Sequence, residues 1–284
     1  MGKIQGSHQE WDAIWDKNME GGQQREIFCQ FTRGTPKTIY EFWQKCYFED
    51  LSELIKGKNY TKFLELGAGK GTTSMYLSDS GIEDITMVDL SDAGFKLATE
   101  NCHREGVKPP KMMVADCEKT GLPDEAYDCI YNIGLLEHFD DPSPTLRETY
   151  RLLKPGGMVF MPIVPAQPFS RSIAARMKYH SISIPKHYAK TLLGKNKKSK
   201  SDGMVRTTYQ ADFYLKICKQ IGFDNLKCIA YNPYWLVVDE TSPNYQKALK
   251  DYIETHQKKK QTGNYPLLET PKGTELCLLL YGTK

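Results

Sequence analysis

The feature that most constrains this fold is the segment of residues 63–71, which reads FLELGAGKG. A short apolar run that contains Glu65 leads into Gly67, Gly69 and Gly71, and a helical stretch follows. Glycine tolerates positive φ, and a turn without side chains lets a ligand lie against bare backbone, while the N-terminus of the next helix favours polar or anionic groups. The segment therefore predicts a β-strand, a ligand-binding turn and a helix.

From Lys58 onward, short apolar runs alternate with helical stretches. This alternation is typical of βαβ units and a parallel sheet. We predict an α/β fold with a Rossmann-like, seven-stranded, mostly parallel sheet and helices on both faces. The predicted strands are 62–66, 84–89, 111–115, 127–132, 157–163, 223–230 and 275–281, and the predicted helices are 72–79, 92–104, 142–153, 210–221 and 244–256.

Appendages surround this core. Residues 1–57 read as helical, and we interpret them as an N-terminal helical lid in which Thr35–Pro36 marks the start of an amphipathic helix. Residues 58–284 form the main domain, with a cap insertion after strand five at 164–208 and a second appendage at 231–272. We expect these appendages, rather than the sheet, to shape any substrate pocket.

Positive charge is concentrated in one segment. The formal net charge is +3, but residues 165–208 hold ten basic residues and one acid, so the rest of the chain carries −6. The segment can be read as a solvated loop, a cap over a pocket, a clamp for an anionic substrate, or a surface for acidic lipid or RNA. Because ligands bind at the carboxyl edge of open α/β sheets, we favour the cap.

The cysteines and the hydropathy bear on cellular location. The eight cysteines include no CxxC pair and no neighbouring histidine at metal-ligand spacing, which indicates reduced thiols and no metal site. No apolar run reaches the roughly 18 residues that a membrane span needs, and the polar start MGKIQGSHQEWD lacks the apolar stretch of a secretory signal. We expect a cytoplasmic protein.

Further polar residues follow the predicted strands in order. Asp89 ends the second strand, 20 residues after Gly69, where a carboxylate can accept hydrogen bonds from both hydroxyls of a ribose. Asp116 ends the third strand, where an acid can accept from an adenine amino group, and Cys117 can present its backbone N–H. The glycine turn alone also fits a nicotinamide or flavin enzyme, so the later motifs decide.

The motifs ELGAGKG, VDLS, ADCEKTGLP, LLEHF and LKPGG resemble, in order, those of class I S-adenosylmethionine-dependent methyltransferases, especially the branch with the ubiquinone and menaquinone biosynthesis enzymes. The resemblance covers about residues 60–163. It implies S-adenosylmethionine as cofactor, S-adenosylhomocysteine as product, and in-line methyl transfer to a small molecule. It also implies cofactor contacts from Glu65, Gly67, Ala68, Gly69, Asp89, Leu90, Asp116, Cys117, Asn132 and Gly134, and an aromatic lid that nominates Trp11 and Trp15.

Methyl transfer needs an aligned nucleophile, and needs a base only if the acceptor carries a proton. Glu137 and His138 are first interpreted as capping and internally hydrogen-bonded residues. For a hydroxyl acceptor, His138 is the best-placed catalytic residue on motif grounds, ahead of His180 and His187. We interpret Gly71 as a helix-packing glycine.

A second motif invites a different reading. Residues 232–235, NPYW, resemble the motif with which nucleic-acid amino-methyltransferases grip an exocyclic amine. The sequence NIGL already occupies the position after the fourth strand, so we predict a turn or a pocket wall at 232–235.

Other functions remain open at this point. RNA or protein methylation has support from the lysines of the basic segment, but no nucleic-acid-binding module accompanies them. An NAD-dependent oxidoreductase is disfavoured by ADCEKTGLP and LLEHF, and a non-catalytic cofactor binder by the intact acids and glycines. We expect a small anionic or hydrophobic acceptor as partner, with peripheral membrane contact as a further option; neither the acceptor atom nor the oligomeric state is indicated.

Overall fold

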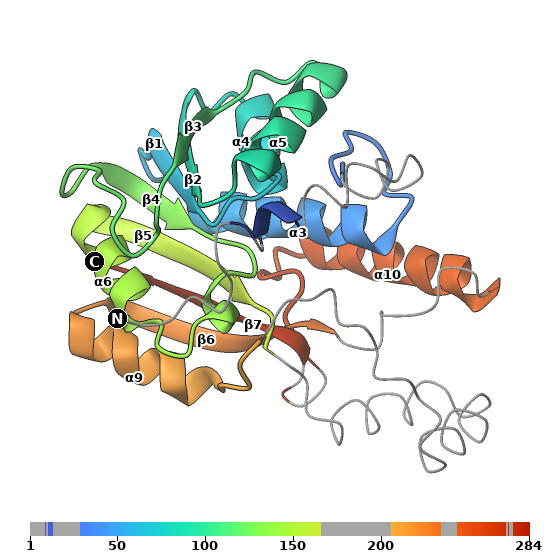
Figure 1. Cartoon of the computed structure of the whole chain (residues 1–284). Coiled ribbons are helices and arrows are strands. Elements are labelled where there is room, and N and C mark those ends of the chain that lie inside the picture. The colour runs from blue at the N-terminus through green and yellow to red at the C-terminus, as the bar shows by residue number, and fades with distance from the viewer. Residues whose placement is uncertain are drawn as a thin grey trace, which may run out of the picture.

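The computed structural model describes residues 9, 11–13, 29–165, 206–233, 243–270, 272 and 275–284. These residues form three layers, with one twisted sheet between two sets of helices (Figure 1). Among the described residues, no helix is both long and apolar enough to cross a membrane.

The sheet has seven strands in the order β3-β2-β1-β4-β5-β7-β6. Neighbouring strands from β3 to β5 are parallel, and β7 is antiparallel to both β5 and β6. This confirms the predicted Rossmann-like, mostly parallel sheet. The strands are β1 (Lys62–Leu66), β2 (Asp84–Asp89), β3 (Lys111–Val114), β4 (Tyr127–Tyr131), β5 (Leu153–Ile163), β6 (Asp224–Pro233) and β7 (Glu275–Thr283).

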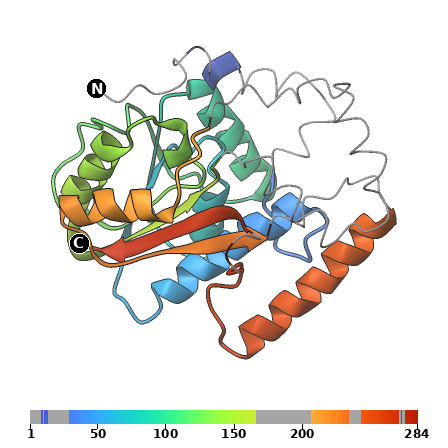
Figure 2. The ribbon, with the colours of Figure 1, turned by 90° about the horizontal axis from the view of Figure 1, so that it is seen from below.

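The helices cover both faces of the sheet. On one face lie α3 (Ile39–Leu54), α4 (Thr72–Asp79), α5 (Asp92–Glu105) and α10 (Pro243–Gln261), and on the other lie α6 (Ser143–Leu152) and α9 (Ala211–Ile221). Figure 2 shows α3 and α10 side by side, in agreement with the Phe42–Tyr252 ring contact of 5.0 Å. A short 3₁₀ helix, η1 (Leu136–His138), follows β4.

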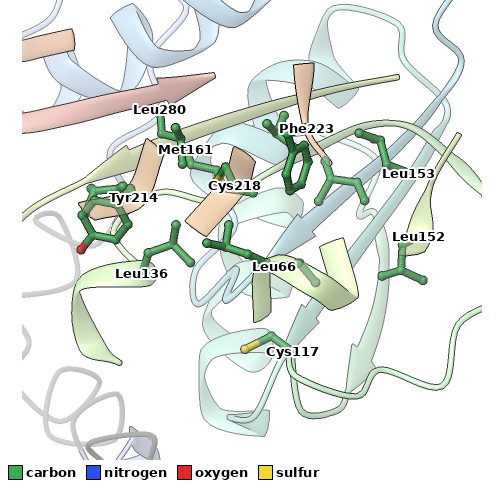
Figure 3. Packing of buried hydrophobic residues seen from close by; sticks show 14 of the residues in the cluster. Leu66, Cys117, Leu136, Leu152, Leu153, Met161, Tyr214, Cys218, Phe223 and Leu280 are labelled. Atoms are coloured by element: carbon green, nitrogen blue, oxygen red, sulfur yellow. The ribbon is translucent and has the colours of Figure 1, made fainter. Parts of the chain in front are cut away.

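Each face of the sheet has its own apolar core, because successive side chains of a strand point to opposite faces. In β1, Phe63 packs toward α3 and α4, whereas Leu64 and Leu66 pack toward α6 and α9. Figure 3 shows Tyr214 and Cys218 of α9 in the second cluster. Each fully buried large side chain contributes about 1.5–3 kcal/mol of burial free energy. The two cores hold the sheet between its helix layers, and so they fix the carboxyl ends of the strands, where the site lies.

The start of α3 differs from the prediction. Thr38, not Thr35, is the N-cap: its hydroxyl accepts from Glu41 N at 3.1 Å, and the Glu41 carboxylate accepts from Thr38 N at 3.4 Å. This reciprocal pair satisfies two backbone N–H groups, which outweighs the favourable position of Pro36. The predicted boundary was therefore three residues early.

Other boundaries also differ from the prediction. β5 begins at Leu153 and not at residue 157, because Leu153 already pairs with Tyr127 of β4, so the LKPGG motif is part of that strand. β6 extends to Pro233, so Asn232 lies in a strand and not in a turn. α10 continues to Gln261, beyond the predicted end at His256.

Candidate functional site

The carboxyl ends of the strands surround a cavity of about 520 Å³, a volume typical of small-ligand sites. The turns after β1 to β5, the end of β6, the start of β7 and one face of α3 all contribute to it. The lining residues used below are Trp11, Tyr40, Trp43, Gln44, Tyr47, Glu65, Gly67, Ala68, Gly69, Lys70, Asp89, Leu90, Ala115, Cys117, Ile133, Gly134, Glu137, His138, Val164, Arg206, Asn232 and Leu276.

The glycine turn lies on the cavity wall in the conformation that the sequence predicts. Gly67 has φ +63°, and a Cβ there would lie 2.6 Å from Leu135 Cδ1, so only glycine fits. At Gly71, φ is +59° and a Cβ would lie 2.4 Å from Met87 Sδ. Gly71 does not line the cavity, which supports its interpretation as a helix-packing residue.

Asp89 sits between the turn and α5. Its Oδ2 accepts a hydrogen bond from Gly69 N at 2.8 Å, and its Oδ1 accepts from Ser91 N at 2.8 Å. Burial raises the pKa of Asp89, and the backbone donors oppose that effect. Because each carboxylate oxygen can accept more than one hydrogen bond, Asp89 retains acceptor capacity toward the cavity.

Glu65 lies deeper, with 3% of its surface exposed. Its Oε2 accepts from Ser74 Oγ at 2.5 Å, and Ser74 Oγ is 2.6 Å from the Tyr131 hydroxyl. Burial raises the pKa of Glu65 to about 8, and the hydrogen bonds from Ser74 lower it. A positively charged ligand group near Glu65 would favour the ionised carboxylate.

Six of the other predicted cofactor residues divide into two groups. Ala68, Leu90, Cys117 and Gly134 line the cavity. Asp116 and Asn132 do not. The Asp116 carboxylate accepts from Glu118 N at 2.8 Å, and the Asn132 side chain is buried with neither polar atom hydrogen-bonded.

The loop after β4 brings His138 to the cavity. Glu137 and His138 are both buried, with Glu137 Oε1 4.0 Å from His138 Nε2. Burial raises the pKa of Glu137, which the neighbouring His138 and Arg206 oppose. The Glu137 carbonyl accepts from Thr207 N at 2.7 Å, which ties η1 to the segment before α9.

Comparison with known proteins shows which kind of domain the central part of the chain forms. Residues 64–161 match the model of a family described as a methyltransferase domain. The chain carries a class I S-adenosylmethionine-dependent methyltransferase domain.

Relatives of this methyltransferase domain differ in what they methylate. Phosphoethanolamine N-methyltransferase 3 of Arabidopsis thaliana is 34% identical over 40% of this chain and 22% of its own length. Ubiquinone biosynthesis O-methyltransferase of Pseudomonas entomophila is 31% identical over 38% of this chain and 46% of its own length. The chain thus spans less than half the length of these relatives.

A solved structure shares the fold of the methyltransferase domain. Phosphoethanolamine N-methyltransferase 2 of Haemonchus contortus, in complex with phosphomonomethylethanolamine and S-adenosylhomocysteine, matches with a TM-score of 0.56. The match covers 96% of this chain and 60% of that one at 15% identity.

Residues 11–13 lie over the methyltransferase cavity. The Trp11 ring meets His138 edge-on, with centroids 5.1 Å apart, and Asp12 Oδ1 accepts from Ser91 Oγ at 2.6 Å. Trp15, the predicted lid residue, lies outside the described residues, as do His180, His187 and the basic segment up to residue 205.

The methyltransferase cavity also has a wall that the sequence did not reveal. Tyr40, Trp43 and Tyr47 of α3 line it. The only signal was their helical spacing, which indicates a buried helix face without separating core from cavity wall. Asn232 does form a pocket wall, as one of the two readings of NPYW predicted; Tyr234 and Trp235 lie outside the described residues.

Proposed function

We propose that this protein transfers a methyl group from S-adenosylmethionine to a small-molecule acceptor. The observation that carries the proposal is the arrangement of Glu65, the glycine turn and Asp89 around one cavity. Because the curated relatives extend well beyond the matched region, the activity of the whole protein stands as a proposal.

The residues present fit the cofactor. The bare backbone at Gly67 and Gly69 leaves room for its amino-acid end, and Glu65 supplies a buried carboxyl group for a cationic centre. Asp89 has acceptor capacity for ribose hydroxyls, and Leu90 and Cys117 line the cavity; the family resemblance implies an adenine contact for Cys117. Asp116 and Asn132, for which the family resemblance also implies cofactor contacts, do not line the cavity.

S-adenosylmethionine supplies a methyl group that is already activated on a sulfonium. The protein must hold the acceptor in line with the carbon–sulfur bond, exclude water, and take a proton where the acceptor carries one. We propose that the side chains lining the cavity align the acceptor. We also propose that residues 1–57, as a lid, and residues 164–208, as a cap, exclude water. His138, packed against Trp11, is the candidate base for a protonated acceptor.

The names of the relatives support small-molecule acceptors, with one N-methyltransferase and one O-methyltransferase among them. We therefore retain a small molecule over RNA or protein as the acceptor. Location in the cytoplasm is part of the same proposal, as is the assignment of residues 231–272 to the substrate side.

Release of S-adenosylhomocysteine tests this function. The purified chain is incubated with S-adenosylmethionine and a panel of small amines, phosphoamines and phenols, and the product is quantified by mass spectrometry. We expect at least one acceptor to raise product release above the acceptor-free rate. Tight cofactor binding without acceptor-dependent product across the panel would instead indicate a non-catalytic binder.

A further inference from the structure

Glu65 lies at one end of a buried chain of hydroxyl groups. Glu65 of β1 and Tyr131 of β4 are partners in the parallel register of the sheet, so their side chains point to the same face. The helix after the glycine turn, α4, lies on that face, and its third residue, Ser74, contacts both side chains. Ser74 and Tyr131 are fully buried, and Glu65 is 3% exposed. The chain thus joins β1, β4 and α4.

The direction of the hydrogen bonds in this chain follows from the number of hydrogens. Ser74 Oγ is 2.5 Å from Glu65 Oε2 and 2.6 Å from the Tyr131 hydroxyl oxygen. A serine hydroxyl has one hydrogen, and an ionised carboxyl group can only accept, so Ser74 donates to ionised Glu65 and accepts from Tyr131. Burial raises the pKa of Tyr131 well above its ordinary value, and the charge of Glu65 adds to the effect. Tyr131 therefore keeps its hydrogen and donates it to Ser74.

The two hydroxyl groups favour the ionised form of Glu65. Burial raises the pKa of Glu65 to about 8, and the hydrogen bonds from Ser74 act in the opposite direction. A hydrogen bond to a charged acceptor is roughly twice as strong as one to a neutral acceptor, and hydrogen bonds in a chain polarise one another. Tyr131 thus strengthens the bond that Ser74 donates, because it occupies the acceptor side of the same hydroxyl group.

The chain leaves one carboxyl oxygen of Glu65 available to a ligand. Glu65 lines the cavity, its Oε2 is engaged by Ser74, and its Oε1 is not among the fully buried atoms without a partner in the described residues. Asp89 acts on Glu65 from β2 and raises its pKa. The other charged or titratable side chains that the argument places around this cavity are Lys70, Glu137, His138 and Arg206.

We propose that Ser74 and Tyr131 are positioning residues of the cofactor site. Their hydroxyl groups hold Glu65 in place and in its ionised form, so that Glu65 Oε1 can pair with the ammonium group at the amino-acid end of S-adenosylmethionine. Neither Ser74 nor Tyr131 lines the cavity, so both act through Glu65. The identity of the ligand rests on the proposed function; the action of the two hydroxyl groups on Glu65 does not.

Carbon-13 NMR of protein labelled in its glutamate carboxyl groups measures the ionisation of Glu65 without any ligand. The Glu65 signal is assigned by its loss in Glu65→Gln. We expect its midpoint near pH 8 in the wild type, about one pH unit higher in Ser74→Ala, and higher by a smaller amount in Tyr131→Phe.

Matched controls come from the same helix and the same strand. Ser78 of α4 donates to the Lys108 carbonyl oxygen at 2.8 Å, and Tyr127 begins β4 at the end opposite to Tyr131. Ser78→Ala and Tyr127→Phe should leave the midpoint of Glu65 unchanged.

Calorimetry then compares S-adenosylhomocysteine with 5′-methylthioadenosine, which lacks the amino-acid end. At pH 7 we expect Ser74→Ala to weaken S-adenosylhomocysteine about tenfold, because one pKa unit corresponds to a factor of ten when the carboxyl group must ionise on binding. Tyr131→Phe should weaken it severalfold. Both variants should bind 5′-methylthioadenosine as the wild type does, and their loss toward S-adenosylhomocysteine should shrink by pH 9, where Glu65 ionises more readily without the ligand.

Two results would indicate a merely structural role and overturn the proposal: an equal loss for both ligands, or a loss that does not change with pH. A Glu65 midpoint that Ser74→Ala and Tyr131→Phe leave unchanged would also overturn it. If the wild type does not bind S-adenosylhomocysteine at any pH, the proposed function fails, and the NMR titration alone decides whether the hydroxyl groups set the ionisation of Glu65.

Discussion

Glu65 and Asp89 carry buried carboxyl groups that accept hydrogen bonds from different kinds of donor, and both residues line the same cavity. Asp89 accepts from two backbone N–H groups, whereas Glu65 accepts from the hydroxyl of Ser74. Burial raises the pKa of both, that of Glu65 to about 8. Asp89 is thus fixed in orientation by the turn it supports, and the charge state of Glu65 is open to change when a cation binds.

The raised pKa of Glu65 makes stability depend on pH. The folded protein binds this proton more tightly than the unfolded chain, so the stabilisation is complete below the ordinary carboxyl pKa and is lost as pH rises through about 8. From about pH 5 to about pH 9, we expect the free energy of unfolding of the wild type to fall by up to about 4 kcal/mol more than that of Glu65→Gln, at about 1.4 kcal/mol for each pH unit below 8. Urea denaturation at both pH values measures this, and equal falls would contradict it.

The sequence was most informative where a residue's role follows from backbone geometry. Gly67 and Asp89 were predicted from spacing after a strand, since the fold places every such position at one sheet edge. Trp43 and Tyr47 could not be predicted as cavity residues, because an aromatic helix face packs equally well against a core. The NPYW motif predicted Asn232 as a turn or pocket-wall residue, but no local pattern encodes its hydrogen bond with Tyr47 of α3, nearly 200 residues away in the chain.

At the scale of elements, α3 joins the sheet to the appendages. It contacts α4 beside the glycine turn, where Thr73 Oγ1 donates to Gln44 Oε1 at 3.4 Å, and it packs against α10 through Phe42 and Cys46. Most strand ranges of the parallel sheet were predicted to within one residue, because buried strands bounded by turns have clear limits. The start of α3 was not, because two Thr residues compete as caps and the local capping box of Thr38 with Glu41, which the prediction did not include, decides.

Substitution at the two competing caps tests that start. Thr38→Ala removes the acceptor for Glu41 N and should lower the free energy of unfolding by about 1 kcal/mol. Thr35→Ala, at an exposed residue outside the helix, should leave it nearly unchanged. Thermal denaturation followed by circular dichroism compares the two, and a larger loss at Thr35 would place the helix start where the sequence first suggested.

At the scale of the whole molecule, one buried acid holds α3 to the sheet. Asp50 of α3 accepts from the Tyr231 hydroxyl at 2.6 Å and from Leu267 N at 2.5 Å. Burial raises the pKa of Asp50 to about 7, against the effect of these donors. Asp50 therefore connects α3, β6 and the loop between α10 and β7.

Asp50→Ala would leave a buried backbone N–H group and a buried tyrosine hydroxyl without acceptors. We expect the free energy of unfolding to fall by about 2–4 kcal/mol, because each unpaired buried group costs about 1–3 kcal/mol. Asp251→Ala, at an exposed acid of α10, is the control and should change little. Chemical denaturation measures both, and a loss below about 0.5 kcal/mol for Asp50→Ala would be inconsistent with this role.

We propose that the cavity binds S-adenosylmethionine through the turn after β1 and Asp89. Calorimetric titration with S-adenosylmethionine, S-adenosylhomocysteine and NADH tests it in the wild type, in Asp89→Asn, and in Asp92→Asn, an exposed acid of α5 paired with Lys96. We predict that both sulfur ligands bind the wild type and Asp92→Asn equally, that Asp89→Asn weakens them at least about tenfold, and that NADH does not bind. Failure of either sulfur ligand to bind, or tight binding of NADH, would contradict the account.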